Sequence, residues 1–403
     1  MERLKTKKTV TAVLFVMILF LYAIINGKKE IPIVADMISE QDAHMSMADR
    51  ISQIDTAITE NAIGRYGFID VYGYIQRVLG KNEESNFEVV KDTEGKMHYT
   101  YDATQPQDVT EICGRMKYLA DVVGDEDTEV IYVMPPDKYI RGYTQFPTGI
   151  PYHMANETAD VFLEKMDEYG ISNMDLRDYL SESGIEMKDV FYTTDHHWKI
   201  ETAFWAAGQF CEWLNAVYGE ELDPDGFYAD KENYNFVTYE DIMLGSMGRK
   251  TGRYYAGVDD FTLIYPKFAT SYNFENTIEE GIVFSGRFEE ALLATPVIRQ
   301  SVTPFDTDMY MTYLYGNPAF AHIENLKETD SIDVCIIKDS FAVPFAAFVS
   351  LRCHNLDMID PRYFEGSYEE TIAEGEYDYV IVMVAPQDLV EEFFPFGEVR
   401  ATE

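Results

Sequence analysis

The hydrophobic residues of this 403-residue chain fall into short continuous runs and into longer segments of helical period. Residues 129–135, EVIYVMP, form a β-branched run that stops at a Pro-Pro pair, which is typical of a buried strand. Residues 189–194, DVFYTT, predict a shorter strand. Three more runs predict strands late in the chain: DVCII at 333–337, LDMID at 356–360 and YVIVMVA at 379–385.

Helical spacing separates these runs. It extends from Thr158 to Tyr169, and it returns after residue 198 at Phe204, Ala207, Phe210, Cys211 and Leu214. Alternation of helices with continuously apolar strands predicts a mostly parallel sheet that is covered by helices on both faces. We therefore expect a three-layer α/β/α domain.

Two stretches interrupt this alternation. Residues 219–280 are rich in Tyr and Gly, and we interpret them as an insertion rather than a separate domain. Residues 27–60 are polar and compatible with a helix, which predicts a stalk. The main domain is then expected to occupy residues 61–403.

The first 26 residues have the pattern of a membrane anchor. The segment MERLKTKK carries four basic residues and one acid, and the seventeen residues from Thr9 to Ile25 carry no charge. At about 1.5 Å each they just reach across a thin hydrocarbon core. We expect a cytoplasmic tail at 1–8, an uncleaved single-pass anchor at 9–26 and an acidic bulk outside the cell membrane. The alternative is a cleaved signal peptide, although no A-x-A site follows. Both place the domain outside the cytoplasm.

The formal net charge of −39 narrows the choice of partners. Nucleic acids and anionic membrane surfaces draw most of their affinity from Lys and Arg, so the charge argues against both. A hydrophobic fraction of 46% is enough for a large core. The four cysteines lack C-x-x-C spacing, and most of them are expected to be buried free thiols.

The stretch YTTDHHWKIETAFW at 192–205 places an acid beside two of the seven histidines. An aspartate two residues before a histidine can orient the imidazole and leave the second ring nitrogen free to take a proton from a hydroxyl. In this interpretation Asp195 orients His197. In CIIKDSFAVPFAAF at 335–348, Ser340 stands where an apolar strand turns into a helix. That position exposes a hydroxyl at the sheet edge. The alternative for Ser340 is a simple helix cap.

These residues resemble the DHHW protein family, and they are similar to the SGNH-like domains of alginate O-acetyltransferase accessory proteins. The motifs of those domains run D-x-H-W and then G-D-S-F. The resemblance extends to VMPPDKY at 133–139, LGSMGRKTGRYYAGVDDF at 244–261, YGNPAF at 315–320 and DPRYFEGS at 360–367. The Asp–His pair precedes the serine, as in the permuted alginate-type domains. The resemblance implies an SGNH-hydrolase-like fold with Ser340 as nucleophile, His197 as general base and Asp195 as its orienting acid.

The oxyanion would be held by the Ser340 N–H and by further donors. Gly316 and Asn317 resemble the Gly and Asn donors of SGNH enzymes, and an ordinary Asn-Pro turn is the alternative. Lys338 replaces the family's glycine, which predicts a stiffer and more cationic site. Lys138 follows a Pro-Pro turn and is expected to face solvent without a role. His196 has no role in the D-x-H spacing and is expected to face water, with contact to the substrate as the alternative.

Candidates for substrate binding are Trp198, Arg249 and Arg253. Trp198 would stack on a sugar ring or pack at the start of the following helix. Arg249 and Arg253, with Lys250 between them, would hold an anionic glycan or donor, or only neutralise nearby carboxylates. No cofactor and no functional metal are expected, because H-x-x-x-H spacing is absent and the acids at Asp223 and Asp225 are too few for a calcium loop.

The resemblance implies extracytoplasmic transfer of an acyl group, most simply acetyl, to a cell-surface polysaccharide. It also implies a multipass membrane-bound O-acyltransferase as the partner that delivers the acyl group. A carbohydrate acetyl esterase is the first alternative, because hydrolysis and transfer share an acyl-serine. A non-catalytic glycan-binding protein is the second. The acceptor, the donor and the oligomeric state are left open.

Overall fold

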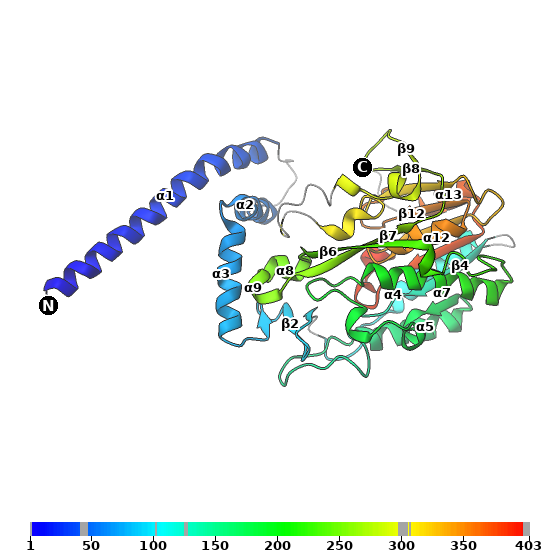
Figure 1. Cartoon of the computed structure of the whole chain (residues 1–403), viewed down its shortest axis with the longest axis horizontal. Helices are drawn as coiled ribbons and strands as arrows, with labels where there is room; N and C mark the ends of the chain where they lie inside the picture. The colour runs from blue at the N-terminus through cyan, green and yellow to red at the C-terminus, as the bar shows by residue number, and fades with distance from the viewer. Residues whose placement is uncertain are drawn as a thin grey trace.

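A mixed sheet of eight strands forms the centre of the domain in the computed structural model (Figure 1). The strand order is β5-β4-β13-β11-β12-β10-β8-β9. Strands β5 to β12 in this order are parallel, and β10, β8 and β9 extend the sheet with antiparallel pairings. The strands are β4 Glu129–Met134, β5 Ser172–Asp175, β8 Tyr272–Asn276, β9 Phe284–Gly286, β10 Phe320–Asn325, β11 Val334–Lys338, β12 Asn355–Ile359 and β13 Tyr379–Met383. The structure describes residues 2–40, 47–100, 103–124, 128–296, 305 and 308–397.

Helices cover both faces of the parallel strands. On one face α7 (Ile200–Tyr218) packs against α12 (Ala342–Val349), and on the other α4 (Thr110–Val123) packs against α5 (Ala155–Tyr169) and α13 (Tyr368–Gly375). Strand residues alternate between two hydrophobic clusters: Ile336 belongs to the α7 side, and Ile337 belongs to the α4 side. This two-sided burial is why the strands are continuously apolar, and it confirms the predicted α/β class.

Most predicted elements are confirmed, but the strand expected at 189–194 is wrong. A 3₁₀ turn at Met187–Asp189 precedes an irregular segment, which among the described residues forms only the isolated Phe191–Trp198 bridge. The backbone N–H groups of Thr193 and Thr194 donate to the carboxylate of Asp259 rather than to a neighbouring strand. A side chain far along the sequence therefore decides the conformation of this segment.

The stretch expected to be an insertion carries a long antiparallel hairpin outside the central sheet. Its strands are β6 (Tyr234–Met243) and β7 (Asp259–Pro266), with α8 (Ser246–Thr251) and α9 (Arg253–Ala256) between them. Tyr234 and Leu263 of the hairpin belong to the same hydrophobic cluster as α7. Strand β8, near the end of the expected insertion, joins the central sheet, so the part outside this sheet ends earlier than 280.

Three helices precede the domain: α1 (Glu2–Glu40), α2 (Met47–Asn61) and α3 (Arg65–Val78). Residues 6–38 of α1 are long and apolar enough to cross a membrane. The helix continues through residue 40, past the boundary expected at 26. A small sheet follows, formed by β1 (Glu83–Glu84), β2 (Val89–Lys91) and β3 (Met97–Tyr99).

All four cysteines are buried free thiols, which confirms the prediction.

A buried ion pair connects the segment after α7 to the 3₁₀ turn Ser350–Arg352, which follows α12. Asp223 accepts hydrogen bonds from the N–H groups of Tyr228 and Ala229 and forms an ion pair of 3.1 Å with Arg352. The Arg352 side chain is 3% exposed, so Asp223 neutralises a cation that water cannot reach.

We expect Asp223→Asn to lower the free energy of unfolding by about 3–5 kcal/mol, because it leaves the buried Arg352 charge unpaired. The matched control is Lys165→Ala, which removes an exposed ion pair with Glu168 and should cost roughly 0–1 kcal/mol. Urea unfolding of the detergent-solubilised full chain, followed by tryptophan fluorescence, measures both. Equal losses for the two variants would contradict this account.

Candidate active site

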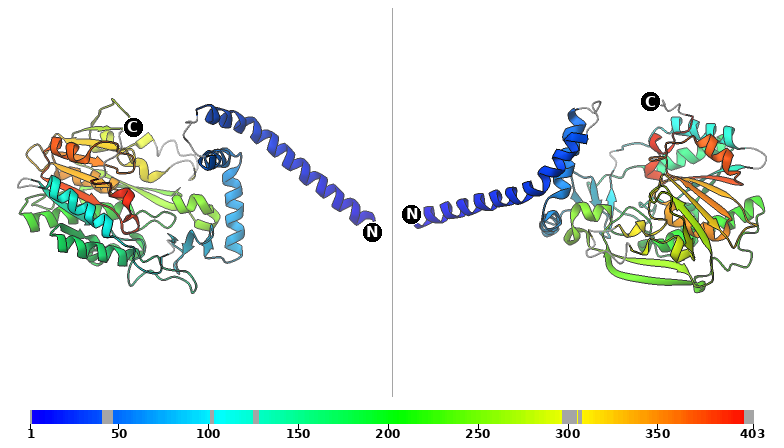
Figure 2. Two further views of the ribbon diagram at one scale, coloured as in Figure 1. Left: turned by 180° about the vertical axis from the view of Figure 1, so that it is seen from behind. Right: turned by 90° about the horizontal axis from the view of Figure 1, so that it is seen from above.

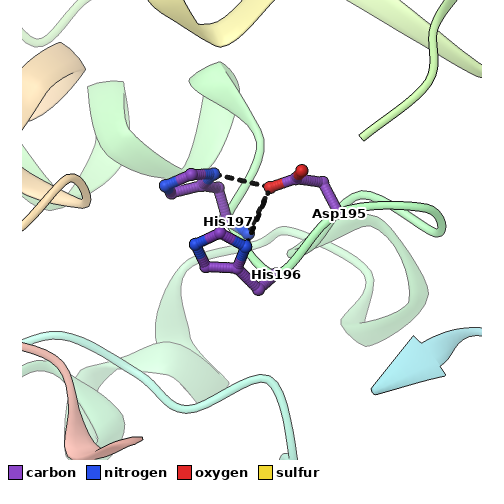
Figure 3. A group of neighbouring side chains, drawn as sticks. All are labelled: Asp195, His196 and His197. Atoms are coloured by element: carbon purple, nitrogen blue, oxygen red, sulfur yellow. Dashed lines mark hydrogen bonds and ion pairs between the residues drawn. The ribbon is translucent and has the colours of Figure 1, made fainter. Parts of the chain in front are cut away.

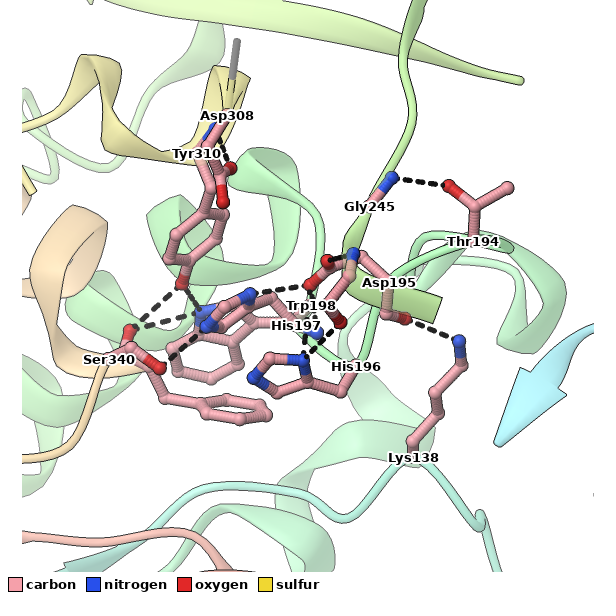
Figure 4. Close-up of polar contacts among 12 residues, drawn as sticks. Lys138, Thr194, Asp195, His196, His197, Trp198, Gly245, Asp308, Tyr310 and Ser340 are labelled. Atoms are coloured by element: carbon pink, nitrogen blue, oxygen red, sulfur yellow. Dashed lines mark hydrogen bonds and ion pairs between the residues drawn. The ribbon is translucent and has the colours of Figure 1, made fainter. Parts of the chain in front are cut away.

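The structure brings Asp195, His197 and Ser340 together at the carboxyl end of β11. His197 Nε2 lies 2.6 Å from Ser340 Oγ, and His197 Nδ1 lies 2.5 Å from Asp195 Oδ1 (Figures 3 and 4). The histidine belongs to the loop before α7 and the serine to the turn between β11 and α12, 143 residues apart. The three side chains form one line of hydrogen bonds with the geometry of a nucleophile, a base and an orienting acid.

The loop that carries Asp195 is fixed by the residues of the β6–β7 hairpin. Asp259 Oδ1 accepts from Thr193 N–H at 2.8 Å, and Oδ2 accepts from both the N–H and the hydroxyl of Thr194 at 2.7 Å. The Thr194 hydroxyl oxygen in turn accepts from Gly245 N–H at 2.9 Å (Figure 4). The loop is thus hydrogen-bonded to both ends of the segment that links the two hairpin strands.

Asp195 fits closely against the start of α8. Its Oδ2 accepts from Ser246 N–H at 2.6 Å, and its Oδ1 also accepts from His197 N–H at 3.0 Å. A Cβ on Gly245 would lie 2.2 Å from the Asp195 Cβ, so only glycine permits this approach. Burial favours the neutral acid, but the two histidines and these donors outweigh it and hold the pKa of Asp195 well below its usual value.

The His197 ring lies between two other rings. Tyr310 stacks on one side, with ring centroids 3.9 Å apart and an interplanar angle of 13°. His196 lies 3.9 Å away at an angle of 36°. This clamp leaves the imidazole little freedom to turn away from Ser340, which is the orientation a general base requires.

Trp198 cannot stack on a sugar in this conformation, because its side chain is fully buried. Its indole N–H donates to the Tyr310 hydroxyl at 3.0 Å and to the Phe341 carbonyl at 3.1 Å (Figure 4). The alternative, that Trp198 packs at the start of the following helix, describes the structure. Trp198 supports the ring that stacks on His197 and the turn that holds Ser340.

The turn at Ser340 is held by the preceding acid. Asp339 accepts from Phe341 N–H at 2.8 Å and from Ala385 N–H at 2.6 Å, and burial raises its pKa. Ser340 is 8% exposed, so its hydroxyl lies just beneath the surface. Among the described residues, no hydrogen bond uses the Ser340 N–H, which leaves it available to an oxyanion.

The site is less cationic than Lys338 led us to expect. The Lys338 side chain is fully buried and forms an ion pair of 2.9 Å with Asp360, which also binds Arg362. The pKa of Asp360 is lowered because these cations outweigh its burial. The lysine charge is therefore neutralised beneath the site and does not face a substrate.

The two predicted oxyanion donors differ. The Gly316 N–H donates to the Tyr313 carbonyl at 3.0 Å, so in this conformation it is engaged in a turn. Lys338 Nζ donates to Asn317 Oδ1 at 2.8 Å, which orients the amide and makes its Nδ2 the group that can donate. Asn317 stays a candidate donor to the oxyanion. Gly316 could donate only if its turn rearranged and released its N–H from Tyr313.

The basic cluster is paired with carboxylates, as its alternative interpretation states. Arg249 binds Asp308 at 2.8 Å, Arg253 binds Asp70 of α3 at 2.6 Å, and Lys250 binds Glu88. Asp308 also accepts from Tyr310 N–H, so Arg249 supports the ring beside His197 rather than an open surface.

Lys138 is a residue whose position the sequence did not reveal. It is 8% exposed, and its Nζ donates to the carbonyls of Thr193 and Asp195, at 3.2 and 2.5 Å (Figure 4). The prediction that it faces solvent is wrong, because the loop after β4 turns its side chain under the DHHW segment. Burial lowers its pKa to about 7. Tyr310, Gly245 and Asp259 were missed too, although the last two lie in a motif that the resemblance included.

His196 is only partly solvent-facing, with 30% of its side chain exposed. Its Nδ1 lies 3.1 Å from Ser246 Oγ, and burial lowers its pKa to about 3. Ligand atoms of Asp195, His196 and His197 lie within 4.8 Å of one another, as a metal ion would require (Figure 3). Each of these side chains already hydrogen-bonds within the site, so an ion would have to displace those bonds.

Comparison with known proteins confirms the resemblance and the fold. Residues 97–234 match a family model described as "SGNH hydrolase-like domain, acetyltransferase AlgX". No curated protein matches the chain. The structure of Bacillus cereus PatB1 with a sulfonyl adduct is similar at 17% identity and a TM-score of 0.61, over 77% of this chain and 97% of that one. A DHHW family protein from Eubacterium siraeum is similar at 17% identity and a TM-score of 0.56, over 76% and 98%.

The low pKa of Lys138 predicts a pH-dependent stability. Between its folded pKa of about 7 and its ordinary value of 10.5, the unfolded chain binds a proton that the folded chain releases. The free energy of unfolding of wild type relative to Lys138→Met should therefore rise with pH above 7, by roughly 1 kcal/mol per pH unit. Below pH 7 both states are protonated and the difference should be flat.

Urea unfolding of both proteins at several pH values from 6 to about 9.5 tests the slope, since the other titrations cancel in the difference. A difference that stays constant over this range would show that Lys138 remains charged in the folded protein.

Proposed function

We propose that this protein transfers an acyl group, most simply acetyl, to a hydroxyl of an extracytoplasmic polysaccharide through an acyl-Ser340 intermediate. The observation that carries the proposal is the continuous hydrogen-bonded line from Asp195 through His197 to Ser340, at 2.5 and 2.6 Å. The similarity of residues 97–234 to an acetyltransferase domain supports the acyl chemistry. The chain also shares its fold with PatB1, a protein whose structure has been solved with a sulfonyl adduct.

In the first half-reaction Ser340 Oγ attacks the acyl carbonyl of the donor while His197 Nε2 takes the hydroxyl proton. Asp195 holds the ring and stabilises the imidazolium that forms. The Ser340 N–H and the Asn317 Nδ2 would donate to the oxyanion and stabilise it. Collapse of the tetrahedral intermediate expels the donor's leaving group, which His197 protonates, and leaves the acyl-serine.

In the second half-reaction an acceptor hydroxyl attacks the acyl-serine. His197 removes its proton, and the same donors hold the second oxyanion before Ser340 leaves and regains its proton. Water as the acceptor would give the acetyl esterase, the alternative enzyme. A protein that only binds glycans has no use for this proton-transfer line, so the geometry favours an enzyme over it.

The location outside the cytoplasm and the partner are also part of the proposal. Helix α1 would cross the cell membrane once and hold the domain on the outer side. A membrane-bound O-acyltransferase would then supply the acyl group through the bilayer.

Ser340→Ala and His197→Ala should each lower turnover of an aryl acetate by roughly 10³-fold or more, and the double variant should be little worse, because both residues act in one step. Asp195→Asn should cost less than either, since no reacting group is lost. His196→Ala should keep most activity, because Tyr310 still stacks on the His197 ring and no reacting group is lost, and it serves as the matched control. Intact mass after incubation with the ester should show an acetyl adduct that Ser340→Ala lacks.

Circular dichroism of each variant separates lost activity from lost structure. An inactive His196→Ala beside an active His197→Ala would reassign the base. Wild-type turnover in all variants would make Ser340 a helix cap and favour the glycan-binding alternative.

The anchor has its own test. The full-length chain should stay in the membrane fraction, and protease added to intact cells should remove everything after about residue 40, where α1 ends. Accumulation in the medium of a chain that begins near residue 28 would instead establish a cleaved signal peptide.

A further inference from the structure

Helix α3 exposes its large apolar side chains and buries its small and polar ones. Asp70, Gly73 and Gln76 are buried against the domain. The side chains that face away from it are between 50% and 67% exposed: Phe68, Val71, Tyr72, Ile75, Val78 and, just past the helix, Leu79. A helix on the surface of a water-soluble domain has the opposite arrangement.

The exposed residues form one continuous stripe. Their spacing of three and four residues places them within an arc of about 120° on a helix that turns 100° per residue. Contiguous apolar patches of this kind mark a surface that another phase or partner covers.

The orientation of α3 is fixed by its buried face. A Cβ on Gly73 would lie 2.2 Å from the Thr251 carbonyl oxygen, so α3 approaches α8 as closely as glycine permits. Asp70 accepts from the Arg253 N–H at 2.9 Å and from its guanidinium at 2.6 Å. Because these contacts hold the inner face, α3 cannot roll its apolar stripe into the domain.

The stripe begins beside the apolar segment of α1. Tyr22 donates to the Ile63 carbonyl at 3.1 Å, and Asn26 Oδ1 accepts from Ile63 N–H at 2.7 Å. The rings of Tyr22 and Phe68 meet edge to face, 5.6 Å apart. Figures 1 and 2 show α3 standing between α1 and the domain, so its free face looks toward the side into which α1 extends.

We propose that α3 lies in the headgroup region of the bilayer that α1 crosses, with its stripe covered by lipid. This inference rests on the proposed membrane anchor. The stripe joins aliphatic side chains to Tyr72, a composition suited to the membrane interface, and it contains no acid. A net charge of −39 would repel an anionic surface, so the contact depends on apolar burial and not on charge.

The proposal gives α3 a task in the reaction. Helix α3 would hold the domain at a fixed distance from the bilayer. It contacts α8, and α8 in turn binds Asp195 through the Ser246 N–H. The triad would thus be held near the membrane from which an acyl group arrives.

The test is photo-cross-linking of the full-length chain in intact cells. Tyr72→p-benzoylphenylalanine places the photoreactive group on the stripe. Tyr118→p-benzoylphenylalanine is the matched control, an exposed tyrosine on α4 in the part of the domain away from α1. After irradiation the chain is recovered from the membrane fraction, and its mass is measured. We expect a phospholipid mass shift for the Tyr72 variant and none for the Tyr118 variant.

Two results would overturn the proposal while leaving the anchor intact. One is a Tyr72 adduct with another polypeptide, which would make the stripe a protein-docking surface. The other is a membrane-bound chain with no lipid adduct at Tyr72. Recovery of the chain from the soluble fraction would overturn the anchor and this inference with it. The turnover of the Ser340 and His197 variants tests the proposed catalytic function independently of both.

Discussion

The loop that carries Asp195 and His197 depends on the Asp259 carboxylate. This carboxylate binds backbone N–H groups that would otherwise pair with a neighbouring strand. Within the described part of the chain, residues 193 and 194 belong to no strand ladder, and Asp259 accepts hydrogen bonds from both of their N–H groups and from the Thr194 hydroxyl. Without these bonds a buried segment would carry unsatisfied donors, each of which costs about 1–3 kcal/mol. The same bonds bring the start of α8 against Asp195. Only a glycine at position 245 leaves enough space for this contact, because any Cβ there would overlap the Asp195 side chain. The hairpin outside the central sheet is therefore part of the site.

Ser340, unlike Asp195 and His197, is positioned by the central sheet and not by the β6–β7 hairpin. Strand β11 delivers it to the edge, and Asp339 fixes the turn through Phe341 and Ala385. Beneath the turn, Lys338 and Asp360 form a fully buried ion pair that also orients the Asn317 amide. The two halves of the site meet in the bond between His197 and Ser340, and Tyr310 holds the ring between them. Each group of the proposed triad is thus held by contacts of its own, as preorganised catalysis would require.

The sequence predicted those features that local pattern controls. The buried strands at 129–135 and 379–385 were evident because both faces of the sheet are covered, and the D-x-H spacing indicated His197 as the base. Features that depend on distant contacts were not accessible. A lysine after a Pro-Pro turn is usually exposed, and nothing near Lys138 reveals that the DHHW loop will cover it. Likewise, Trp198 is buried because Tyr310, which lies 112 residues away, accepts its indole N–H.

The acidity of the chain and the apolar face of α3 have a common consequence for the proposed reaction. Charge would repel the domain from an anionic bilayer, but an anchor formed by α1 would tie the domain there and keep it and the surface at a high effective concentration. Under that tether even a weak apolar contact is occupied most of the time, since no translational entropy remains to be lost. A modest stripe on α3 is then enough to fix the domain's orientation.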